Sequence, residues 1–212
     1  MRIIGNRGNT ARKVQAVASG ALASGDTVVV NADGTVSVPS SAFGTTVVFE
    51  NANTSKESAT FDSNSNKVVI AYVDNGNSGH GTAIVGTVSG TSISFGSPTV
   101  FEASLNVADT SITFDSNSNK VVISFSDTAA GNYGTAIVGT VSGTSISFGT
   151  PTVFESASTS QISSTFDSNL NKVVIAYRDN GNSVYGTAIV GTVSSTSISF
   201  GSATVFESAA VD

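Results

Sequence analysis

The chain contains no cysteine and no tryptophan, and it has a single histidine, His80. Without cysteine, disulfide bonds cannot stabilise the fold, and thiolate or zinc–thiolate chemistry is excluded. Without tryptophan, the side chain that best marks a sugar-binding lectin is missing. The composition therefore offers little to a metal or a cofactor, and we predict that the protein uses neither.

Charged residues are also scarce. They make up 11% of the 212 residues, against about 25% in an ordinary soluble domain. The formal net charge is −6, and a protein that binds nucleic acid needs a basic field instead. The surface must be covered mostly by Ser, Thr, Asn and Gly, which suits a shell or fibre facing water better than a cytosolic enzyme. We therefore predict no nucleic-acid partner.

Long apolar runs are absent as well. No stretch approaches the roughly 20 residues that a membrane-spanning helix needs. The N-terminus has charges but no long apolar segment before a cleavage site, so it does not have the pattern of a secretory signal. We predict no membrane insertion, and an exit from the cell by another route, such as lysis.

The few basic residues are unevenly placed. Four of the nine Lys and Arg residues precede the first acid, Asp26. They are Arg2, Arg7, Arg12 and Lys13. A basic arm thus precedes an acidic body, and it is either a solvated tail or an arm that docks on an acidic partner surface. We take these four residues as candidate docking residues.

An internal repeat organises the rest of the chain. The sequence GTAIVGTVSGTSISFG occupies 81–96 and 134–149, and it recurs at 186–201 with a single change, Ser195. Two shorter motifs keep the same period of 52–53 residues. FDSNSNKVVI lies at 61–70, 114–123 and, with one change, 166–175; TVFE lies at 99–102, 152–155 and 204–207, preceded by VVFE at 47–50. We divide the chain into an N-terminal segment, 1–40, and three and a half repeats, 41–212.

Each repeat carries four strand signals, where β-branched and aromatic residues lie between Gly, Asn, Asp and Ser. In the first copy they cover 59–61, 67–73, 81–88 and 91–102, the last broken at Gly96 and Pro98. The second strand is apolar on both sides, which is typical of a strand covered on both faces. The fourth alternates like a half-exposed strand. A helix is allowed only over 9–18, so the fold class is all-β with four-stranded antiparallel units.

Four strands in about 50 residues is the size of a β-propeller blade. Three units do not close a ring, because propellers have roughly four to eight blades. Three explanations remain open: the natural chain continues past Asp212, chains pair to complete a ring, or the units form a solenoid or sandwich stack. Since an open stack would expose apolar faces, we predict a homo-oligomer.

The N-terminal segment is not a copy of the repeat. Residues 27–30 and 35–38 flank Asp33-Gly34, a pair typical of a tight hairpin turn. A segment of this length is too small to hold a core alone. We expect it to pack on the repeats, on its own copies, or on a partner.

Two segments resemble known sequences. ASGALASGDTVVVNADGTVSV, at 18–38, resembles the opening of small phage capsid-decoration and fibre proteins. The repeat, TFDSNSNKVVIAYVDNGNS followed by GTAIVGTVSGTSISFGSPTVFESA, is similar to repeats in uncharacterised proteins predicted from marine phages. The resemblance implies a virion structural protein, such as a head or tail fibre, on the particle surface. It supplies no catalytic residues.

Two loops of each repeat contain several acid and amide side chains. Asp62, Asn64 and Asn66 match the start of a calcium loop, but its twelfth position is Val73, where a bidentate acid is needed. An Asx turn, in which the side chain caps backbone N–H groups, explains the pattern better. The same interpretation applies to the loop that begins at Asp74.

Variation among the repeats is the remaining signal of binding. The copies differ in the joining stretches, 51–59, 103–111 and 156–164, and around His80, Tyr133 and Tyr185. We expect both to be exposed loops, which is how repeat proteins present binding surfaces. The three ring-bearing residues are candidate ligand-binding residues, since tyrosine rings can stack on sugars; neutral drift in exposed loops is the alternative.

These observations predict a non-enzymatic virion structural or accessory protein. The N-terminal segment would dock on other virion proteins of the capsid or tail, and the repeats would project outward and contact host glycans. Two alternatives stay open: a bacterial cell-surface adhesin, and a sialidase-like propeller enzyme. An enzyme is disfavoured because the acids recur in every unit, which indicates a structural role.

Overall fold

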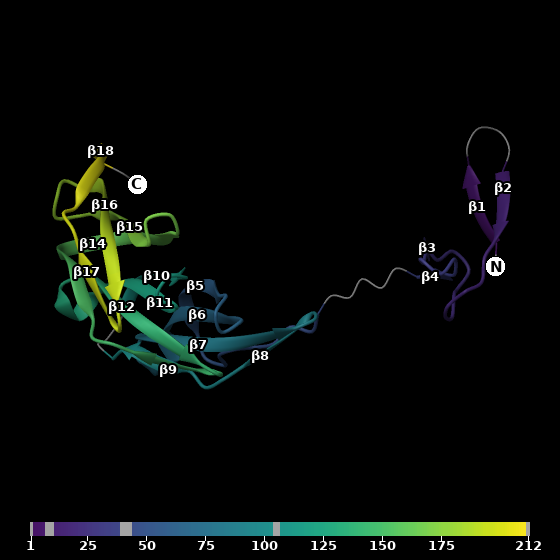
Figure 1. Cartoon of the computed structure of the whole chain (residues 1–212), viewed down its shortest axis with the longest axis horizontal. Helices are drawn as coiled ribbons and strands as arrows, with labels where there is room; N and C mark the ends of the chain where they lie inside the picture. The colour runs from purple at the N-terminus through teal and green to yellow at the C-terminus, as the bar shows by residue number, and fades with distance from the viewer. Residues whose placement is uncertain (1, 7–10, 39–43, 104–106, 211–212) are drawn as a thin grey trace. The chain divides into compact units, whose positions relative to one another are not determined.

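The computed structural model describes residues 2–6, 11–38, 44–103 and 107–210 (Figure 1). The chain divides into two compact units, Met1–Gly44 and Thr45–Asp212. Regular structure in the described residues consists of β-strands and two 3-10 turns, and every sheet is antiparallel. The all-β prediction is confirmed at this level. None of the described helical segments is long and apolar enough to cross a membrane.

The first unit contains two hairpins. Strands β3 (Val29–Val30) and β4 (Val36–Ser37) form the predicted hairpin, with Gly34 at φ 80° in its turn. Val36 is fully buried, and its backbone bonds to Val17 and Ser19. Strands β1 (Arg2–Asn6) and β2 (Ala11–Gln15) form the other hairpin. Because β2 lies inside 9–18, the helix allowed there is wrong.

The second unit contains the repeats, which we number 1 (54–102), 2 (107–155) and 3 (159–207). Repeat 1 consists of β5 (Thr54–Asp62), β6 (Lys67–Asp74), η1 (Asn75–Asn77), β7 (His80–Ser89), β8 (Ser92–Phe95) and β9 (Thr99–Glu102). Repeat 2 consists of β10 (Val107–Asp115), β11 (Lys120–Asp127), η2 (Thr128–Ala130), β12 (Tyr133–Ser142), β13 (Ser145–Phe148) and the start of β14 (Thr152–Asp167). Repeat 3 consists of the end of β14, β15 (Lys172–Asp179), β16 (Tyr185–Ser194), β17 (Ser197–Phe200) and β18 (Thr204–Ala210).

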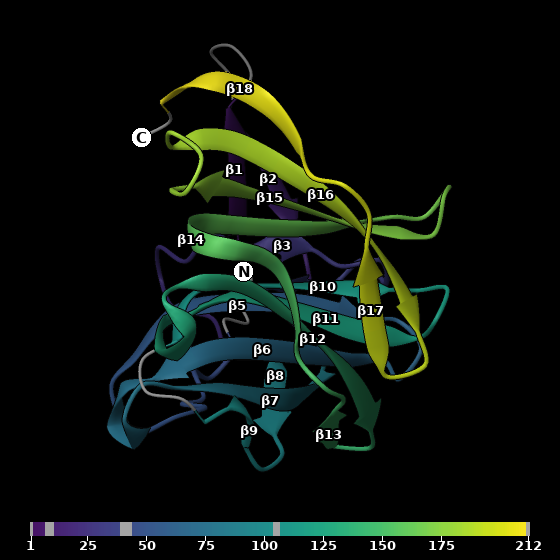
Figure 2. The ribbon, with the colours of Figure 1, turned by 90° about the vertical axis from the view of Figure 1, so that its left-hand side faces the viewer.

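Each repeat is a four-stranded meander. The first strand pairs with the second and the second with the third, and both halves of the fourth strand pair with the third. The break at Gly96 and Pro98 falls where it was predicted. Strand β14 is continuous, so it is both the last strand of repeat 2 and the first strand of repeat 3. The strands of the three repeats lie in successive layers, with β10 between β5 and β14 (Figure 2).

The first strand of each repeat differs from the prediction. The sequence indicated 59–61, but β5 begins at Thr54, and β10 and β14 extend likewise. The joining stretches are therefore mostly strand, and describing them as exposed loops was wrong. Each strand has a bulge, and its extra residue has a positive φ: Lys56 at 57°, Asp109 at 47° and Gln161 at 52°. The start of each strand was not predicted because the residues around the bulge are polar. Main-chain pairing forms the strand there, and it does not require β-branched side chains.

Burial of the second strand follows its position in the stack. In β11 every residue from 121 to 126 is buried, so the sheet of repeat 2 is covered on both faces. In β6 Val69 is fully buried, whereas Ile70 is half-buried. In β15 buried and half-buried residues alternate. The prediction of a doubly covered strand is confirmed for repeat 2, and each end repeat is covered fully on one face only.

Aromatic rings fasten each repeat to the next. Phe101 covers Gly81 in its own repeat and packs against Phe125 and Phe148 of repeat 2, with ring centroids 5.3 and 5.8 Å apart. Phe154 contacts Tyr177 and Phe200 of repeat 3 at 5.2 and 5.7 Å. Two hydrophobic clusters, one at each junction between repeats, form the core.

The turn between the third and fourth strands requires a positive φ at its first central residue. Gly90 and Gly143 supply it at φ 59° and 61°, and Ser195 adopts 58° in repeat 3. The predicted strand bounds, 81–88 and 91–102, placed this turn one residue too early. A non-glycine residue in this region costs about 1 kcal/mol or more, so the turn of repeat 3 is the strained one.

Candidate functional site

The Asp-Ser-Asn loops are Asx turns, as predicted. The Oδ1 atom of Asp62 accepts hydrogen bonds from the backbone N–H groups of Asn64 and Ser65, at 2.9 and 3.0 Å. Asp115 and Asp167 make the same pair of bonds in repeats 2 and 3. The carboxylate thus accepts hydrogen bonds from backbone N–H groups that would otherwise lack a partner in the turn between the first two strands.

The loop after the second strand uses a second capping acid. Asp74 accepts from the N–H of Asn77, and Asp179 accepts from Gly181 and Asn182. Asp127 keeps this role although the residues after it differ, because it accepts from the N–H groups of Ala129 and Ala130. The recurring acids therefore fix turn geometry. Among the described residues, no group of three or more His, Cys, Asp or Glu side chains is placed to hold a metal ion.

The structure places His80, Tyr133 and Tyr185 at equivalent positions, each the first residue of a third strand. Each lies opposite the capping acid of its own repeat and is half-buried. They are strand ends, so the expectation that they lie in exposed loops was wrong. No ring pair among the described residues includes either tyrosine, and each residue belongs to a different sheet layer.

The next repeat holds two of the three loops that precede these residues. The carbonyl oxygen of Gly79 accepts from the N–H of Val107, and that of Asn132 accepts from Thr159. Val184 occupies the equivalent position in repeat 3, with φ 66°. A β-branched residue with positive φ is a true outlier, so the loop before Tyr185 is strained where the other two contain glycine or asparagine.

Two tyrosine–glutamate hydrogen bonds were not predicted from the sequence: one joins repeat 3 to repeat 2, and the other joins repeat 1 to the residues just before it. The hydroxyl of Tyr177 donates to Glu155 at 3.2 Å, and that of Tyr72 donates to Glu50 at 3.5 Å. In both cases burial, followed by the negative charge of the glutamate, raises the pKa of the tyrosine above its ordinary value. The alternation of Tyr72, Phe125 and Tyr177 at one repeat position was the signal in the sequence.

We expect the protein to lose stability above pH 10, and the Tyr72→Phe/Tyr177→Phe variant to lose less. The folded pKa of each tyrosine lies above the unfolded value near 10, so the contribution is present below pH 10 and is lost as pH rises further. The slope is at most about 1.4 kcal/mol per pH unit for each tyrosine. Urea unfolding at pH 8, 10 and 11 measures it. Equal slopes in the parent and the variant would contradict the assignment.

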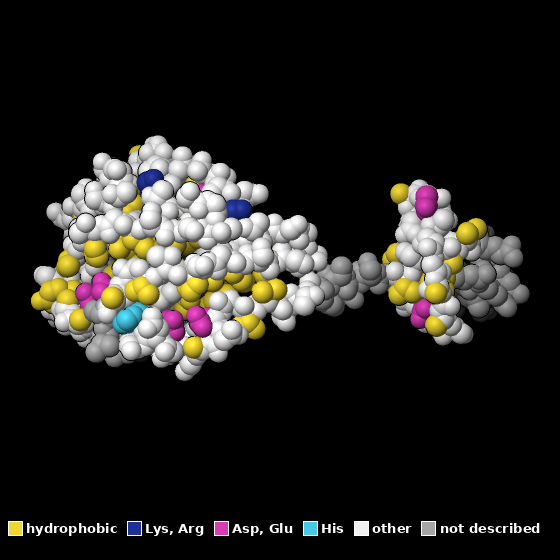
Figure 3. All heavy atoms as spheres, turned by 90° about the horizontal axis from the view of Figure 1, so that it is seen from below, with side chains coloured by type: hydrophobic (Ala, Val, Ile, Leu, Met, Phe, Trp, Pro, Cys, Tyr) yellow, Lys and Arg dark blue, Asp and Glu magenta, His cyan; other side chains and the backbone are white. Residues whose placement is uncertain are grey.

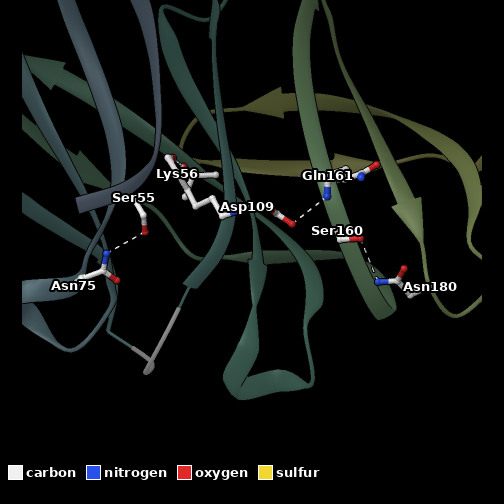
Figure 4. A network of polar contacts seen from close by, with 8 residues as sticks. Ser55, Lys56, Asn75, Asp109, Ser160, Gln161 and Asn180 are labelled. Atoms are coloured by element: carbon white, nitrogen blue, oxygen red, sulfur yellow. Dashed lines mark hydrogen bonds and ion pairs between the residues drawn. The ribbon is translucent and has the colours of Figure 1, made fainter. Parts of the chain in front are cut away.

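A polar ladder crosses the first strands at the bulges (Figure 4). Lys56 pairs with Asp109 of repeat 2, Nζ to Oδ1 at 3.1 Å, and the other carboxylate oxygen accepts from the N–H of Gln161 in repeat 3 at 3.0 Å. Ser111 links repeats 2 and 3 nearby, since its Oγ accepts from the N–H of Ser164. These contacts fix the register between repeats.

Of the four candidate docking residues, three lie in the β1–β2 hairpin. Arg2 is opposite Gln15, Arg12 is opposite Gly5, and Lys13 is opposite Ile4. Arg7 lies outside the described residues. The hairpin thus brings Arg2, Arg12 and Lys13 into one small sheet.

No family model, no curated protein and no solved structure matches this chain. The recurring residues of the repeats form a scaffold of capped turns and packed aromatic rings. Side chains differ between repeats at the bulges and at the starts of the third strands.

Proposed function

We propose that the protein is a non-enzymatic structural component of a virus particle, anchored by its N-terminal unit, with β-repeats that face outward and contact host glycans. The observation that carries the proposal is that the recurring acids cap backbone turns. Asp62, Asp74 and their copies accept backbone hydrogen bonds in all three repeats. An acid engaged in capping turns is a poor candidate for acid–base catalysis, and its recurrence supports a scaffold.

The division of the chain supports the anchoring part of the proposal. Residues 1–44 form a compact unit separate from the repeats, with hairpins of their own. Three of the four arm residues lie in one hairpin. This hairpin therefore brings together positive charges that can bind an acidic surface on a capsid or tail protein. Such docking is electrostatic and should weaken with salt.

The surface of the repeats supports the outward-facing part. On the face shown in Figure 3 the charged side chains are few and scattered, and uncharged surface predominates. Ser, Thr and Asn offer hydrogen bonds to sugar hydroxyls without a charge to desolvate. The half-buried rings of Tyr133 and Tyr185 offer flat apolar faces for the sugar ring.

The proposal predicts that the chain co-purifies with virus particles and that reversing the arm charges releases it. In the full chain, Arg2→Glu/Arg7→Glu/Arg12→Glu/Lys13→Glu should leave less than about a tenth of the parental amount on gradient-purified particles. The matched control reverses Lys67, Lys120 and Lys172 on the repeats and should stay bound. Particles carrying Tyr133→Ala/Tyr185→Ala should keep the chain but adsorb less to host cells. The proposal would be contradicted if purified particles contained none of the parental chain. It would also be contradicted if the arm variant bound to particles as well as the parental chain does.

A further inference from the structure

The side of each repeat that meets the following repeat, here called the trailing face, is open in repeat 3. Phe101 and Phe154 are 6% and 8% exposed, whereas their counterpart Phe206 is 65% exposed. Val85 and Val138 are fully buried, whereas Val190 is 46% exposed. In repeat 3 this face consists of Val174, Ala176, Arg178, Ala188, Val190 and Phe206.

Exposure of Phe206 is specific to this face. Val100, Val153 and Val205 precede the three phenylalanines, and their side chains are 39%, 49% and 41% exposed. The exposed fraction of these valines thus does not distinguish the end repeat from the inner ones. The contrast at Phe206 therefore arises because no repeat packs on this face of repeat 3 among the described residues.

The opposite side of each repeat, the leading face, is open in repeat 1. Phe61 is 53% exposed, whereas Phe114 and Phe166 are half-buried against the preceding repeat. Val68 and Ile70 are likewise only half-buried. In repeat 1 this face consists of Glu57, Phe61, Val68, Ile70, Val88 and Ile93. The two junctions inside the chain are the same pairing, trailing face on leading face, so the open ends are two halves of an interface that the protein already builds twice.

The two open end faces carry charged residues at positions that are uncharged in the other repeats. On the trailing face, Arg178 takes the position of Val73 and Ser126, and its Nε is buried with no hydrogen-bond partner among the described residues. It lines a hollow with Tyr177 and Phe206. The end of the trailing face thus carries a guanidinium group whose Nε lacks an acceptor among the described residues.

The matching anion lies on the leading face. Glu57 takes the position that Thr110 and Ile162 occupy in the other repeats. Side chains at this position point to the preceding repeat, because Thr110 Oγ1 donates to the carbonyl oxygen of Lys56, and Ile162 lies in the cluster with Val122. The first strands that carry it lie against the second strand of the preceding repeat. Joining the open faces brings Glu57 toward Arg178.

One segment now occupies the aromatic slot of the leading face. Phe49 packs on Tyr72 and Phe95 with centroids 5.2 and 6.0 Å away, as Phe154 does on Tyr177 and Phe200. Residues 45–50 are in no strand, so only side chains and isolated bonds hold them. The sequence TVFE that contains Phe206 is paired with β16 and matches the VVFE around Phe49. Phe206 of another chain can therefore replace Phe49 at little cost in backbone hydrogen bonds.

We propose that a second copy of this chain covers the open faces, with the trailing face of each copy on the leading face of the other. Phe206 replaces Phe49 between Tyr72 and Phe95, and Arg178 pairs with Glu57. Two copies bring six repeats together, within the range of about four to eight blades that closes a propeller, whereas three copies would exceed it. A head-to-tail contact that closes gives a ring.

Sedimentation velocity of the full chain over a wide concentration range tests the proposal. We expect a reversible species of two copies. Arg178→Glu should weaken association by about a hundredfold, and adding Glu57→Arg should restore most of it. Phe206→Ser should weaken association, the matched control Val205→Ser should not, and Phe49→Ala should strengthen it by about tenfold. Circular dichroism shows that each variant is folded.

Crosslinking fixes the orientation, because the chain has no cysteine of its own. The Oγ atoms of Ser111 in repeat 2 and Ser164 in repeat 3 lie 2.9 Å apart. The corresponding pair between copies is Ser163 and Ala59, where two cysteine side chains would be close enough to form a disulfide. Ala59→Cys/Ser163→Cys should give a covalent dimer on oxidation, and each single variant should stay uncrosslinked.

Four results would overturn the proposal: a parent that stays monomeric at all concentrations, Arg178→Glu that associates normally, a dimer crosslinked through Ser163→Cys alone, or a ladder of long crosslinked chains. The third would show tail-to-tail pairing and the fourth an open filament. None of these outcomes depends on particle attachment, so the proposed function is tested separately.

Discussion

Replacing Phe154 by alanine is expected to destabilise the protein by about 3–5 kcal/mol, whereas Phe206→Ala is expected to cost less than about 1 kcal/mol. The two residues occupy the same position in adjacent repeats, and both cover a glycine, Gly134 or Gly186. Phe154 is 8% exposed and packs on two rings of repeat 3, whereas Phe206 is 65% exposed. The chain thus supplies a matched control with the same chemical deletion.

The stability lost in Phe154→Ala should be concentrated at the junction of repeats 2 and 3. In a repeat array the stability is approximately the sum of repeat terms and nearest-neighbour terms, so Phe154→Ala should let repeat 3 unfold before the rest. Urea unfolding at a concentration where the chain is monomeric gives the total, and hydrogen exchange gives the location. Exchange should accelerate in β15 and β16 more than in β6 and β7. Equal losses in the two alanine variants would contradict the stacking.

The repeat strands could be predicted because their pattern is redundant. The second strand is rich in β-branched and aromatic residues in all copies, and Asn and Asp bound it. Asx turns followed from Asp62 and its copies, since a short acid before two amides caps local N–H groups. The second strand of repeat 2 is covered on both faces, as its apolar faces indicated.

The remaining features depend on contacts between residues far apart in the sequence. The start of β5 is polar, and backbone pairing with β6 forms it. The pairing of Phe101 with Gly81 joins the last strand of a repeat to the third, and no local pattern reveals it. The candidate residues His80, Tyr133 and Tyr185 were expected in loops because glycine and asparagine precede them, but hydrogen bonds from the next repeat hold two of those loops at a strand end.

Gly149→Ala is expected to destabilise the protein by about 3 kcal/mol, and Gly201→Ala to leave the monomer unchanged. A Cβ on Gly149 would lie 1.8 Å from the backbone oxygen of Thr196 in the next repeat, and a backbone atom cannot rotate away. At Gly201 the nearest atom is the carbonyl oxygen of Val190, at 3.8 Å. Neither glycine has a positive φ, so the added methyl group changes packing and introduces little backbone strain.

Thermal unfolding of both alanine variants separates the two causes. At about 2–4 °C per kcal/mol for a chain of this size, Gly149→Ala should lower the midpoint by roughly 6–12 °C, and Gly201→Ala should match the parent in dilute solution. A loss of the same size at Gly201 would mean that the glycine is needed within its own repeat. Contact between repeats explains the difference only if Gly201→Ala is silent in the monomer. The same variant should then lower the affinity between copies, because there Gly201 meets Thr91 as Gly149 meets Thr196.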